Sequence, residues 1–375
     1  MWTFPDYTPH RPIDWAQLTH RYAWLDEMRH VPQDPEWHGE GDVLTHTQMV
    51  VDELFRLPEF AELSPQNQHI LFTAALLHDV EKRSTTREEI IDGKTRIVSP
   101  RHAQKGELTA RQILYRDIAT PFAVREQICK LVRLHGLPLW AISKPDPERA
   151  VIAASLVVDT RLLAMLARAD VLGRICADKD EILLRIDLFQ EMCQELDCWG
   201  KPRAFATENA RYHYLNQGGS VDYVPYDDFA CEVVMMCALA GSGKDTFIHK
   251  HLSHLPMISL DDIRRAHKLN PADSHDTAEA VRIGKELAKQ YLREKRSFVF
   301  NATNLNRDLR SKWASIFAAY GAKIKIVYLE VPHSQWLAQN KQREHSVPEK
   351  VLAQMLGKWE VPSFDEAHEI VFQAA

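Results

Sequence analysis

The chain has no apolar segment near the ~18 consecutive residues that a membrane-spanning helix requires, so we expect no transmembrane span. Its first residues, MWTFPDYTPHRP, lack the basic start and apolar stretch of a secretory signal, and we therefore expect a cytoplasmic location. The six cysteines are scattered and none forms a CxxC pair, which argues against a zinc ribbon or a disulfide framework. No internal repeat or low-complexity tract is present, and the composition is that of an ordinary globular protein.

The length and the distribution of charge indicate more than one domain. At 375 residues the chain is too long for a single hydrophobic core of usual size, so we expect two or three domains. The net charge of −6 is uneven, because the residues from Cys231 onward carry a small excess of Lys and Arg, whereas the preceding residues are acidic. A basic second half suits an anionic substrate, and an acidic first half suits cations.

The pattern of apolar residues changes near residue 200. Residues 1–200 are expected to form a helical domain that begins with an ordered segment rich in Trp and Pro, and its one strand-like interruption is Glu88–Val98, a short hairpin. Residues 201–229 mix Pro, Gly and Tyr and are predicted to be a linker. Within residues 230–375, continuous apolar runs such as CEVVMMCALA alternate with helical patterns, which predicts an α/β fold around a parallel sheet.

A phosphate-binding loop follows the first of these apolar runs. Glycines between a buried strand and a helix let backbone N–H groups turn toward phosphate oxygens, and the helix presents its positive end to the same charge. We therefore expect a nucleoside triphosphate such as ATP, with Mg²⁺, to bind at Gly241, Ser242, Gly243, Lys244, Asp245 and Thr246. Two positions depart from the usual GxxxxGK[ST] pattern, because Ala238 replaces the first glycine and Asp245 replaces the hydroxyl that normally ligates the metal.

A pair of carboxylates follows the next apolar pair of residues, where a second strand is expected to end. Active sites of α/β sheets lie at the carboxyl ends of their strands. A carboxylate of the pair Asp261-Asp262 could accept the proton of an attacking hydroxyl, and Arg264 could hold a phosphate of the acceptor. Taken alone, the same residues also fit a helix N-terminus with acidic caps and a surface arginine.

The order of these motifs resembles that of the phage-type 5′-hydroxyl polynucleotide kinases. The likeness rests on the P-loop, on Asp261-Asp262-Ile-Arg264 and on Phe300–Asn306, which contains the sequence TNLN. The resemblance implies that Asp261 is the general base and that Arg264 contacts the acceptor phosphate. It also implies a helical lid late in the chain, in which Arg343 would bridge the β- and γ-phosphates. The family often has an acidic residue just ahead of TN, where this chain has Asn301 and Ala302.

Several of the 18 histidines lie on apolar stripes of predicted helices in the first half. A single histidine of this kind is more often a satisfied core residue than a ligand. A carboxylate on a buried stripe, however, needs a partner, because an unpaired buried charge is too costly, and a metal ion supplies one. The positions that combine into a candidate metal site are His46, His78, Asp79, His102, His135 and Asp170.

The order His, His-Asp, then a distant Asp resembles that of the HD superfamily of metal-dependent phosphohydrolases. The closest segments are Leu76–Lys82 and Leu166–Asp170. The resemblance implies that His46, His78, Asp79 and Asp170 hold one metal, and that His102 and His135 let a second metal bind, with Asp79 as a bridge. One or two divalent ions of Mn, Co, Ni, Fe or Zn suit such imidazole-rich shells better than Mg²⁺ does. His38, in Trp37-His38-Gly39-Glu40, has no assigned role.

The combination of the two domains resembles the bacterial HD-Pnk end-healing enzymes over nearly the whole chain. This resemblance implies an RNA-repair enzyme with two activities. The kinase would phosphorylate 5′-hydroxyl ends of RNA or DNA, and the HD domain would remove a 2′,3′-cyclic phosphate or 2′-phosphate. A separate RNA ligase would then join the ends. Two other readings are an HD nucleotide phosphohydrolase fused to a small-molecule kinase of the nucleoside type, and a nucleotide-gated regulator without activity. The sequence leaves the oligomeric state open.

Overall fold

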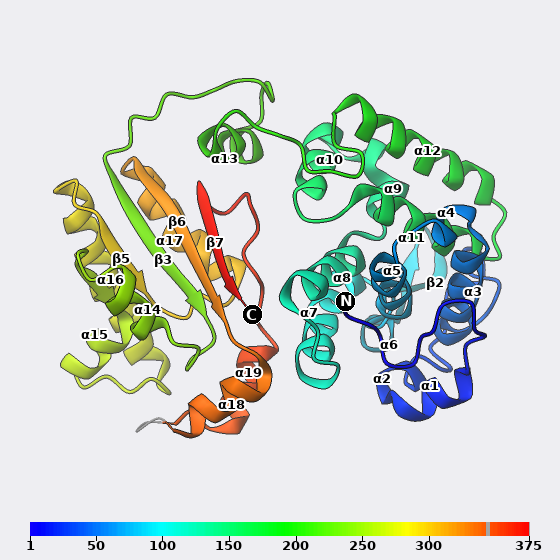
Figure 1. Ribbon diagram of the computed structural model, residues 1–375, viewed down its shortest axis with the longest axis horizontal. Helices are drawn as coiled ribbons and strands as arrows, with labels where there is room; N and C mark the ends of the chain where they lie inside the picture. The colour runs from blue at the N-terminus through cyan, green and yellow to red at the C-terminus, as the bar shows by residue number, and fades with distance from the viewer. Residues whose placement is uncertain (343–345, 375) are drawn as a thin grey trace. The chain divides into compact units, whose positions relative to one another are not determined.

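The computed structural model describes residues 1–342 and 346–374. The chain divides into two compact units, Met1–Ala204 (unit 1) and Phe205–Ala375 (unit 2). Figure 1 shows that unit 1 is built mainly of helices and that unit 2 is built around a sheet. The predicted fold class, a helical domain followed by an α/β domain with a parallel sheet, is confirmed.

Unit 1 is a cluster of mostly short helices around one hydrophobic core. Helices α3, α5, α8 and α11 pack on one another and supply about half of the core side chains. The helices described in unit 1 are α1 (Trp15–Arg21), α2 (Ala23–Asp26), α3 (Val43–Arg56), α4 (Pro58–Ala61), α5 (Pro65–Leu77), α6 (Lys82–Thr85), α7 (His102–Gln112), η1 (Ile113–Asp117), α8 (Phe122–Leu134), α9 (Leu137–Trp140), η2 (Ala141–Ser143), α10 (Pro147–Ser155), α11 (Thr160–Leu172) and α12 (Lys179–Glu195).

Helix α5 lies at the centre of this core. Ser64 caps its N-terminus by accepting a hydrogen bond from the Asn67 backbone N–H, and Pro65 occupies the first helical position, where the missing N–H costs nothing. Every side chain from Gln68 to Leu77 is buried, which is the pattern of a helix surrounded by other helices rather than one with a solvent face. The helix ends at His78, so its C-terminus places the His78-Asp79 pair inside the unit.

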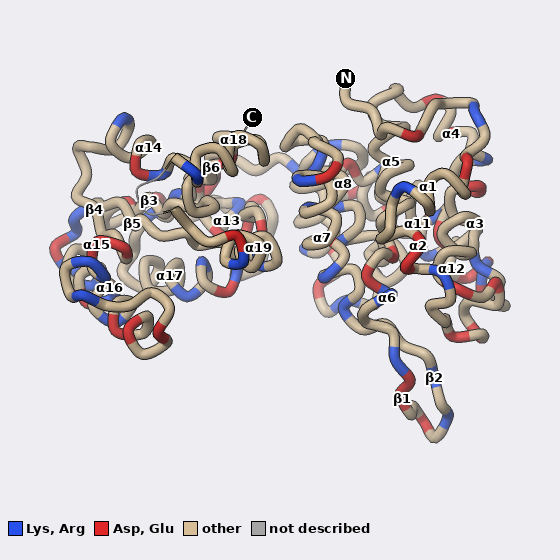
Figure 2. The backbone as a smooth tube through the Cα atoms, turned by 90° about the horizontal axis from the view of Figure 1, so that it is seen from below, with Lys and Arg blue, Asp and Glu red and all other residues tan. Residues whose placement is uncertain are grey.

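The predicted hairpin is confirmed. Strands β1 (Arg87–Ile91) and β2 (Lys94–Val98) pair antiparallel, and Asp92 and Gly93 between them both have positive φ values of 51° and 77°. Positive φ at both central residues is typical of the tight hairpin turn whose twist matches that of the strands. Figure 2 shows the hairpin extending away from the helices of unit 1.

Unit 2 contains a five-stranded parallel sheet with the strand order β4-β5-β3-β6-β7. The strands are β3 (Cys231–Ala238), β4 (Met257–Ser259), β5 (Phe298–Asn301), β6 (Ala322–Glu330) and β7 (Glu369–Ala374). The helices of unit 2 are α13 (Glu208–Gln217), α14 (Lys244–His251), α15 (Leu260–Ala266), α16 (Ser274–Arg293), α17 (Arg307–Ala319), α18 (His333–Lys341) and α19 (Glu349–Leu356).

Helices cover both faces of this sheet, as the continuous apolar character of β3 predicts. On one face, Ile248 of α14 packs with Val234, Met236 and Val299. On the other face, Phe300 contacts the ring of Trp313 of α17 at 4.1 Å between centroids. Because β3 is central and its carboxyl end leads into the predicted phosphate loop, the loop is anchored on a strand that is buried at all but one residue.

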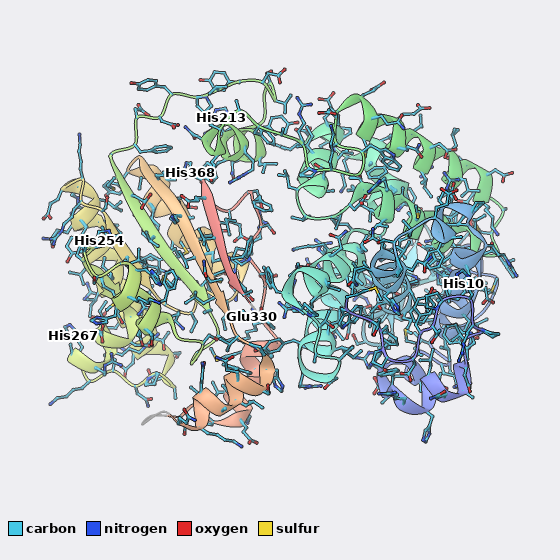
Figure 3. All side chains as sticks on the ribbon, in the orientation of Figure 1. His10, His213, His254, His267, Glu330 and His368 are labelled. Carbon is cyan, nitrogen blue, oxygen red and sulfur yellow. The ribbon has the colours of Figure 1, made fainter. Side chains whose placement is uncertain are left out.

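The predicted linker, residues 201–229, contains helix α13, which packs within unit 2. The Arg211 guanidinium donates to the backbone oxygens of Phe364, Ala367 and His368, and Tyr212 lies 4.0 Å from the His368 ring. Figure 3 marks His213 on α13 and His368 at the start of β7. The His368 ring accepts a hydrogen bond from the Ile324 N–H, so this histidine has a structural role in the sheet.

Among the described residues, no single helix is long and apolar enough to cross a membrane. The bent pair α10 and α11, with 110° between its members, meets the criteria of length and composition only when the two helices are taken together.

A glycine brings helices α3 and α11 into close contact. Gly173 follows α11, and a Cβ atom there would lie 2.8 Å from the Val50 backbone nitrogen and 3.0 Å from its Cα. These distances are shorter than real Cβ contacts, and the obstructing atoms are backbone atoms that cannot rotate away. Since α3 carries His46 and α11 carries Asp170, this approach brings the two candidate metal ligands to the same place.

We expect Gly173→Ala to destabilise unit 1 by about 1–3 kcal/mol, the usual cost of forcing extra volume into a packed core. Thermal and urea unfolding followed by circular dichroism would measure the change. Gly357→Ala is the matched control, because Gly357 also has a negative φ but its nearest neighbours lie at 3.6 Å or beyond. Equal stability of the two variants would show that the close approach of α3 and α11 does not require a glycine at position 173.

Candidate functional site

Three histidines of unit 1 are oriented by the same kind of hydrogen bond, from the ring to a backbone carbonyl oxygen. His78 and His135 directly follow the last residues of α5 and α8, and His102 is the first residue of α7. Each places its Nδ1 atom against the carbonyl oxygen three residues earlier, at 2.7 Å for Ala75, 2.8 Å for Val132 and 2.8 Å for Ser99. Because a carbonyl oxygen only accepts, Nδ1 carries the proton in all three rings, and each Nε2 presents a lone pair.

These lone pairs converge on the carboxylate of Asp79. His78 Nε2 lies 3.2 Å from Asp79 Oδ2, His102 Nε2 lies 3.3 Å from Asp79 Oδ1, and His135 Nε2 lies 4.0 Å from the same oxygen. The His102 and His135 Nε2 atoms are themselves only 3.3 Å apart. The Asp79 carboxylate and the His102 and His135 Nε2 atoms therefore bring acceptors close together. The structure places one cation beside them, the Lys82 ammonium, 2.8 Å from Asp79 Oδ2.

His46 and Asp170 complete the cluster from helices α3 and α11. The His46 Nε2 atom lies 3.1 Å from Asp170 Oδ1 and 3.8 Å from Asp79 Oδ2. Both side chains are almost fully buried. The structure therefore brings together all six positions that the sequence singled out for a metal, although they span residues 46 to 170.

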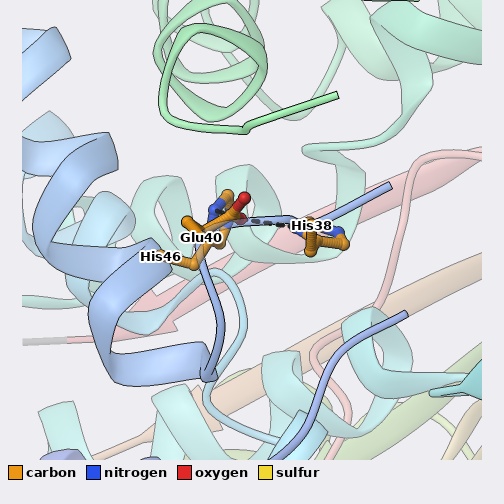
Figure 4. A group of neighbouring side chains, drawn as sticks. All are labelled: His38, Glu40 and His46. Atoms are coloured by element: carbon orange, nitrogen blue, oxygen red, sulfur yellow. Dashed lines mark hydrogen bonds and ion pairs between the residues drawn. The ribbon is translucent and has the colours of Figure 1, made fainter. Parts of the chain in front are cut away.

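Glu40 belongs to the same cluster and was missed by the sequence analysis. Its Oε1 atom lies 2.8 Å from both His46 Nδ1 and His38 Nδ1, as Figure 4 shows for the three side chains, and its Oε2 accepts the Ile175 backbone N–H. Although burial raises the pKa of Glu40, the contacts with His38 and His46 hold that pKa well below its usual value. In the sequence, His38 and Glu40 stand shortly before His46 of α3. This spacing alone does not show that the three side chains meet; only the fold does.

The buried carboxylates stay ionised and the outer imidazoles stay neutral. Burial raises the pKa of Asp79, but Lys82 and His78 outweigh it and hold that pKa well below its usual value; Arg174 has the same effect on Asp170. Burial lowers the pKa of His102, and burial together with the neighbouring imidazoles lowers the pKa of His135 to about 3. Anionic carboxylates and neutral imidazoles are the forms that bind metal ions.

The polar atoms of the cluster fit a metal centre. His78 Nε2 and Asp79 Oδ1 are buried and have no hydrogen-bond donor, which is costly unless a cation satisfies them. The ligand atoms fall into two triads, each within 4.8 Å, which share Asp79: His46 and His78 complete one, and His102 and His135 the other. This set of nitrogen and carboxylate oxygen donors suits Mn, Fe, Co, Ni or Zn ions.

A pocket of about 1140 Å³ opens onto this cluster within unit 1. Asp79, His102 and His135 form part of its wall. The rest of the wall carries charges of both signs and two exposed tryptophans. The cations are Lys82, Arg133, Lys144, Arg174 and Arg185, the further carboxylates are Asp34, Glu36, Asp178 and Glu181, and the tryptophans are Trp37 and Trp140.

In unit 2 the predicted phosphate loop connects β3 to α14. Gly241 and Gly243 have φ values of 86° and 91°, which L-residues with a side chain rarely adopt. No atom lies within 4 Å of the position of a Gly243 Cβ, so backbone conformation, and not space, requires this glycine. The Lys244 ammonium donates to the carbonyl oxygens of Ala238 and Leu239 at 3.5 and 3.3 Å, and therefore lies over the loop.

The neighbouring strand ends carry the other predicted kinase residues. Asp261 and Arg264 follow β4 in α15 and pair with each other at 2.6 Å, with the Asp261 carboxylate largely exposed. Since β4, β5 and β3 are parallel neighbours, their carboxyl ends lie along one edge of the sheet. Arg343, which the sequence analysis assigned to a lid, lies outside the described residues.

Asn301 was not assigned a contact by the sequence analysis. At the end of β5 its Nδ2 donates to Asp245 Oδ1 at 2.7 Å, which joins the strand end to the residue in place of the usual P-loop hydroxyl. Asn301 itself is buried, and its Oδ1 has no hydrogen-bond partner. A hydrogen bond to the Asp245 carboxylate orients it at the position where the metal ligand normally stands.

The TNLN turn is held rigidly behind the loop. Asn304, at φ 47°, donates from Nδ2 to the Met236 carbonyl oxygen of β3 at 2.7 Å. The buried Arg310 guanidinium donates to the Asn304 carbonyl oxygen and also pairs with both carboxylate oxygens of Glu366, at 2.7 and 3.0 Å. This turn therefore fixes the position of the β5 end relative to β3.

Comparisons with known proteins agree with the division into two kinds of domain. Residues 43–173 match the family model described as HD domain, and residues 233–362 match the AAA domain model AAA_33. No curated protein matches the chain.

Two solved structures are similar to part of the chain. One is a sugar kinase from Janibacter sp. HTCC2649, at 20% identity over 38% of this chain and 85% of its own, with a TM-score of 0.30. The other is the APS kinase of Mycobacterium tuberculosis in complex with AMPPNP and APS, at 16% identity over 38% and 88%, with a TM-score of 0.29.

Residues 43–173 therefore match an HD domain and residues 233–362 an AAA-type P-loop domain. An HD domain implies a divalent metal, and a P-loop domain implies a nucleotide with Mg²⁺.

Proposed function

We propose that the chain is a bifunctional enzyme that heals RNA ends, with a 5′-hydroxyl polynucleotide kinase in unit 2 and a metal-dependent 2′,3′-cyclic phosphate and 2′-phosphate hydrolase in unit 1. The observation that carries the proposal is that one chain holds two clusters of the residue types that phosphate chemistry uses. One is the group of His and Asp side chains around Asp79, at a pocket whose wall includes Lys82 and Arg174, and the other is a P-loop beside an Asp-x-x-Arg strand end. The products of the two activities are the 5′-phosphate and free 3′ end that a separate RNA ligase joins.

In the hydrolase, His46, His78, Asp79 and Asp170 would hold one divalent ion, and His102 and His135 would hold a second that shares Asp79. Such ions activate water and neutralise the charge of a phosphate undergoing displacement. Lys82, which donates to Gln33 at 2.7 Å and pairs with Asp79 at 2.8 Å, keeps that carboxylate ionised. Arg174 does the same for Asp170 at 2.6 Å, and both cations face the pocket, where they attract a phosphate ester.

In the kinase, the backbone N–H groups from Gly241 to Thr246 would cradle the triphosphate, and Lys244 would turn from the loop carbonyls to the outer phosphates. Asp245, oriented by Asn301, would serve in place of the P-loop hydroxyl as the protein group nearest Mg²⁺. Asp261 would take the proton of the attacking 5′-hydroxyl, while Arg264 holds the adjacent phosphate of the acceptor. Arg343 is proposed to reach the β- and γ-phosphates from the lid.

We predict that one RNA carrying a 5′-hydroxyl and a 2′,3′-cyclic phosphate is modified at both ends, and that two variants separate the activities. Lys244→Ala should abolish phosphorylation and leave phosphate removal intact, whereas Asp79→Ala should do the reverse, since each removes a group from one site. Product analysis at each end with ATP measures both. An unchanged 5′ end, with a free nucleoside phosphorylated well, would instead favour a small-molecule kinase.

We predict that Asp261→Asn slows phosphoryl transfer by roughly 10²–10⁴-fold, the usual contribution of a positioned base, without weakening ATP binding. Asp262→Asn is the matched control, because Asp262 is adjacent, exposed and paired with Arg265. Single-turnover kinetics and nucleotide titration measure the two effects. An Asp261→Asn protein that keeps more than a tenth of wild-type turnover would remove Asp261 from this role.

We predict that Glu40→Gln lowers the affinity of unit 1 for divalent metal by about 10–100-fold, because outer carboxylates orient ligating imidazoles and raise their basicity. Metal content after dialysis against graded chelator concentrations measures the change. Glu36→Gln serves as the control, since Glu36 lies at the same pocket but pairs with Arg96 rather than with a cluster histidine. Equal metal retention in both variants would show that Glu40 does not support the ligands.

A further inference from the structure

Two tryptophans at the pocket of unit 1 are unusually exposed. Trp37 is 42% exposed and Trp140 is 52% exposed, whereas the other tryptophans of the chain are buried or half-buried. Both line the pocket that opens onto the Asp79 cluster. An indole is a large apolar surface, and its exposure beside a candidate catalytic centre indicates a ligand surface rather than an incidental surface position.

An arginine is placed over the ring of each tryptophan. The Arg96 guanidinium carbon lies 5.7 Å from the Trp37 ring centre, and that of Arg185 lies 4.8 Å from the Trp140 ring centre. Salt bridges hold both arginines, to Asp34 at 3.1 Å and to Glu181 at 2.6 Å. Each indole therefore packs against a salt-bridged arginine, and about half of its surface is exposed.

The pocket combines three features that single-stranded nucleic acid requires. Aromatic rings stack on bases of any sequence, and the Asp79 cluster lies where a terminal phosphate would be processed. Arg133 and Lys144 are cations that can pair with backbone phosphates, in a wall that also carries Asp34, Glu36, Asp178 and Glu181. The volume of about 1140 Å³ exceeds the roughly 300–1,000 Å³ of sites for drug-sized ligands. The space therefore suits more than one nucleotide.

We propose that Trp37 and Trp140 form a stacking site that binds the last two bases of a single-stranded RNA 3′ end and so places its terminal phosphate at the Asp79 cluster. This inference rests on the proposed hydrolase function of unit 1. It adds that the hydrolase acts on unpaired 3′ ends, with little regard to base identity, because stacking reads the flat face of a base and not its edge.

The test is a cycle that pairs protein variants with abasic substrates. Oligoribonucleotides with a 5′-phosphate and a 2′,3′-cyclic phosphate are made with normal bases, or with an abasic residue at the last or the penultimate position. Each is assayed with the wild-type protein, Trp37→Ala, Trp140→Ala and Trp140→Phe. Ile142→Ala is the control, because Ile142 is also exposed, lies two residues from Trp140 and does not line the pocket.

Each tryptophan-to-alanine change should lower kcat/KM for the normal substrate by between about 5- and 150-fold, chiefly through KM, and should have little further effect on one of the abasic substrates. Trp140→Phe, which keeps a stacking ring, should retain most of the activity, and Ile142→Ala all of it. Equal losses on normal and abasic substrates, or no loss, would overturn the stacking site.

Binding separates this inference from the proposed reaction. Fluorescence anisotropy of a labelled oligoribonucleotide, in the presence of a chelator, reports affinity without turnover. If the affinity depends on Trp140 and on the base but the cyclic phosphate survives in the presence of metal, the stacking site stands and the proposed hydrolysis is wrong. If hydrolysis proceeds while affinity and kcat/KM ignore the tryptophans, the hydrolase stands and the stacking site is wrong.

Discussion

The buried carboxylate of Asp79 is the constraint on which unit 1 depends. The Nδ1 atoms of the His78, His102 and His135 rings around it lie against backbone carbonyl oxygens, so these rings turn Nε2 toward the carboxylate. The ammonium group of Lys82, at 2.8 Å, is a donor beside it. Such a cluster is unfavourable in a protein interior unless cations balance it. Lys82 and Arg174 supply part of the balance, and a divalent ion would supply the rest.

The packing of the helices follows from the need to hold this cluster together. Helix α5 is buried on all sides and ends at His78, while α8 ends at His135, so two helix ends meet at one point. Helix α3 reaches the same point only because Gly173 has no side chain where α11 meets Val50. The same helices that form the hydrophobic core therefore determine the distances between the candidate metal ligands. A change in helix packing would alter these distances.

Unit 2 relies on a different constraint, the conformation of a short loop. Gly241 and Gly243 adopt backbone angles that turn N–H groups outward, and the loop is supported by the buried strand β3 and by the Asn304 turn. The pair Asp245 and Asn301 shows how one unusual loop residue is matched by another at the next strand end. Side-chain packing therefore fixes the positions of the site residues in unit 1, and backbone conformation fixes them in unit 2.

Much was readable from the sequence because it depends on local pattern. The glycine-rich loop after an apolar run, the alternation of strands and helices in unit 2 and the Asp92-Gly93 hairpin all follow from short-range spacing. The six His and Asp positions were combined because their order resembles that of the HD superfamily, since each histidine alone also fits a core residue. Glu40, the carbonyl partners of the histidines, the contact between Asn301 and Asp245, and the shared pocket of Trp37 and Trp140 did not follow from the sequence alone. These contacts join residues that are distant in sequence or carry no pattern of their own, so only the packing of complete helices and strands decided which atoms meet. The residue types determined which groups can bind metal, phosphate or a base. The tertiary structure determined which of these groups lie together and how they are oriented.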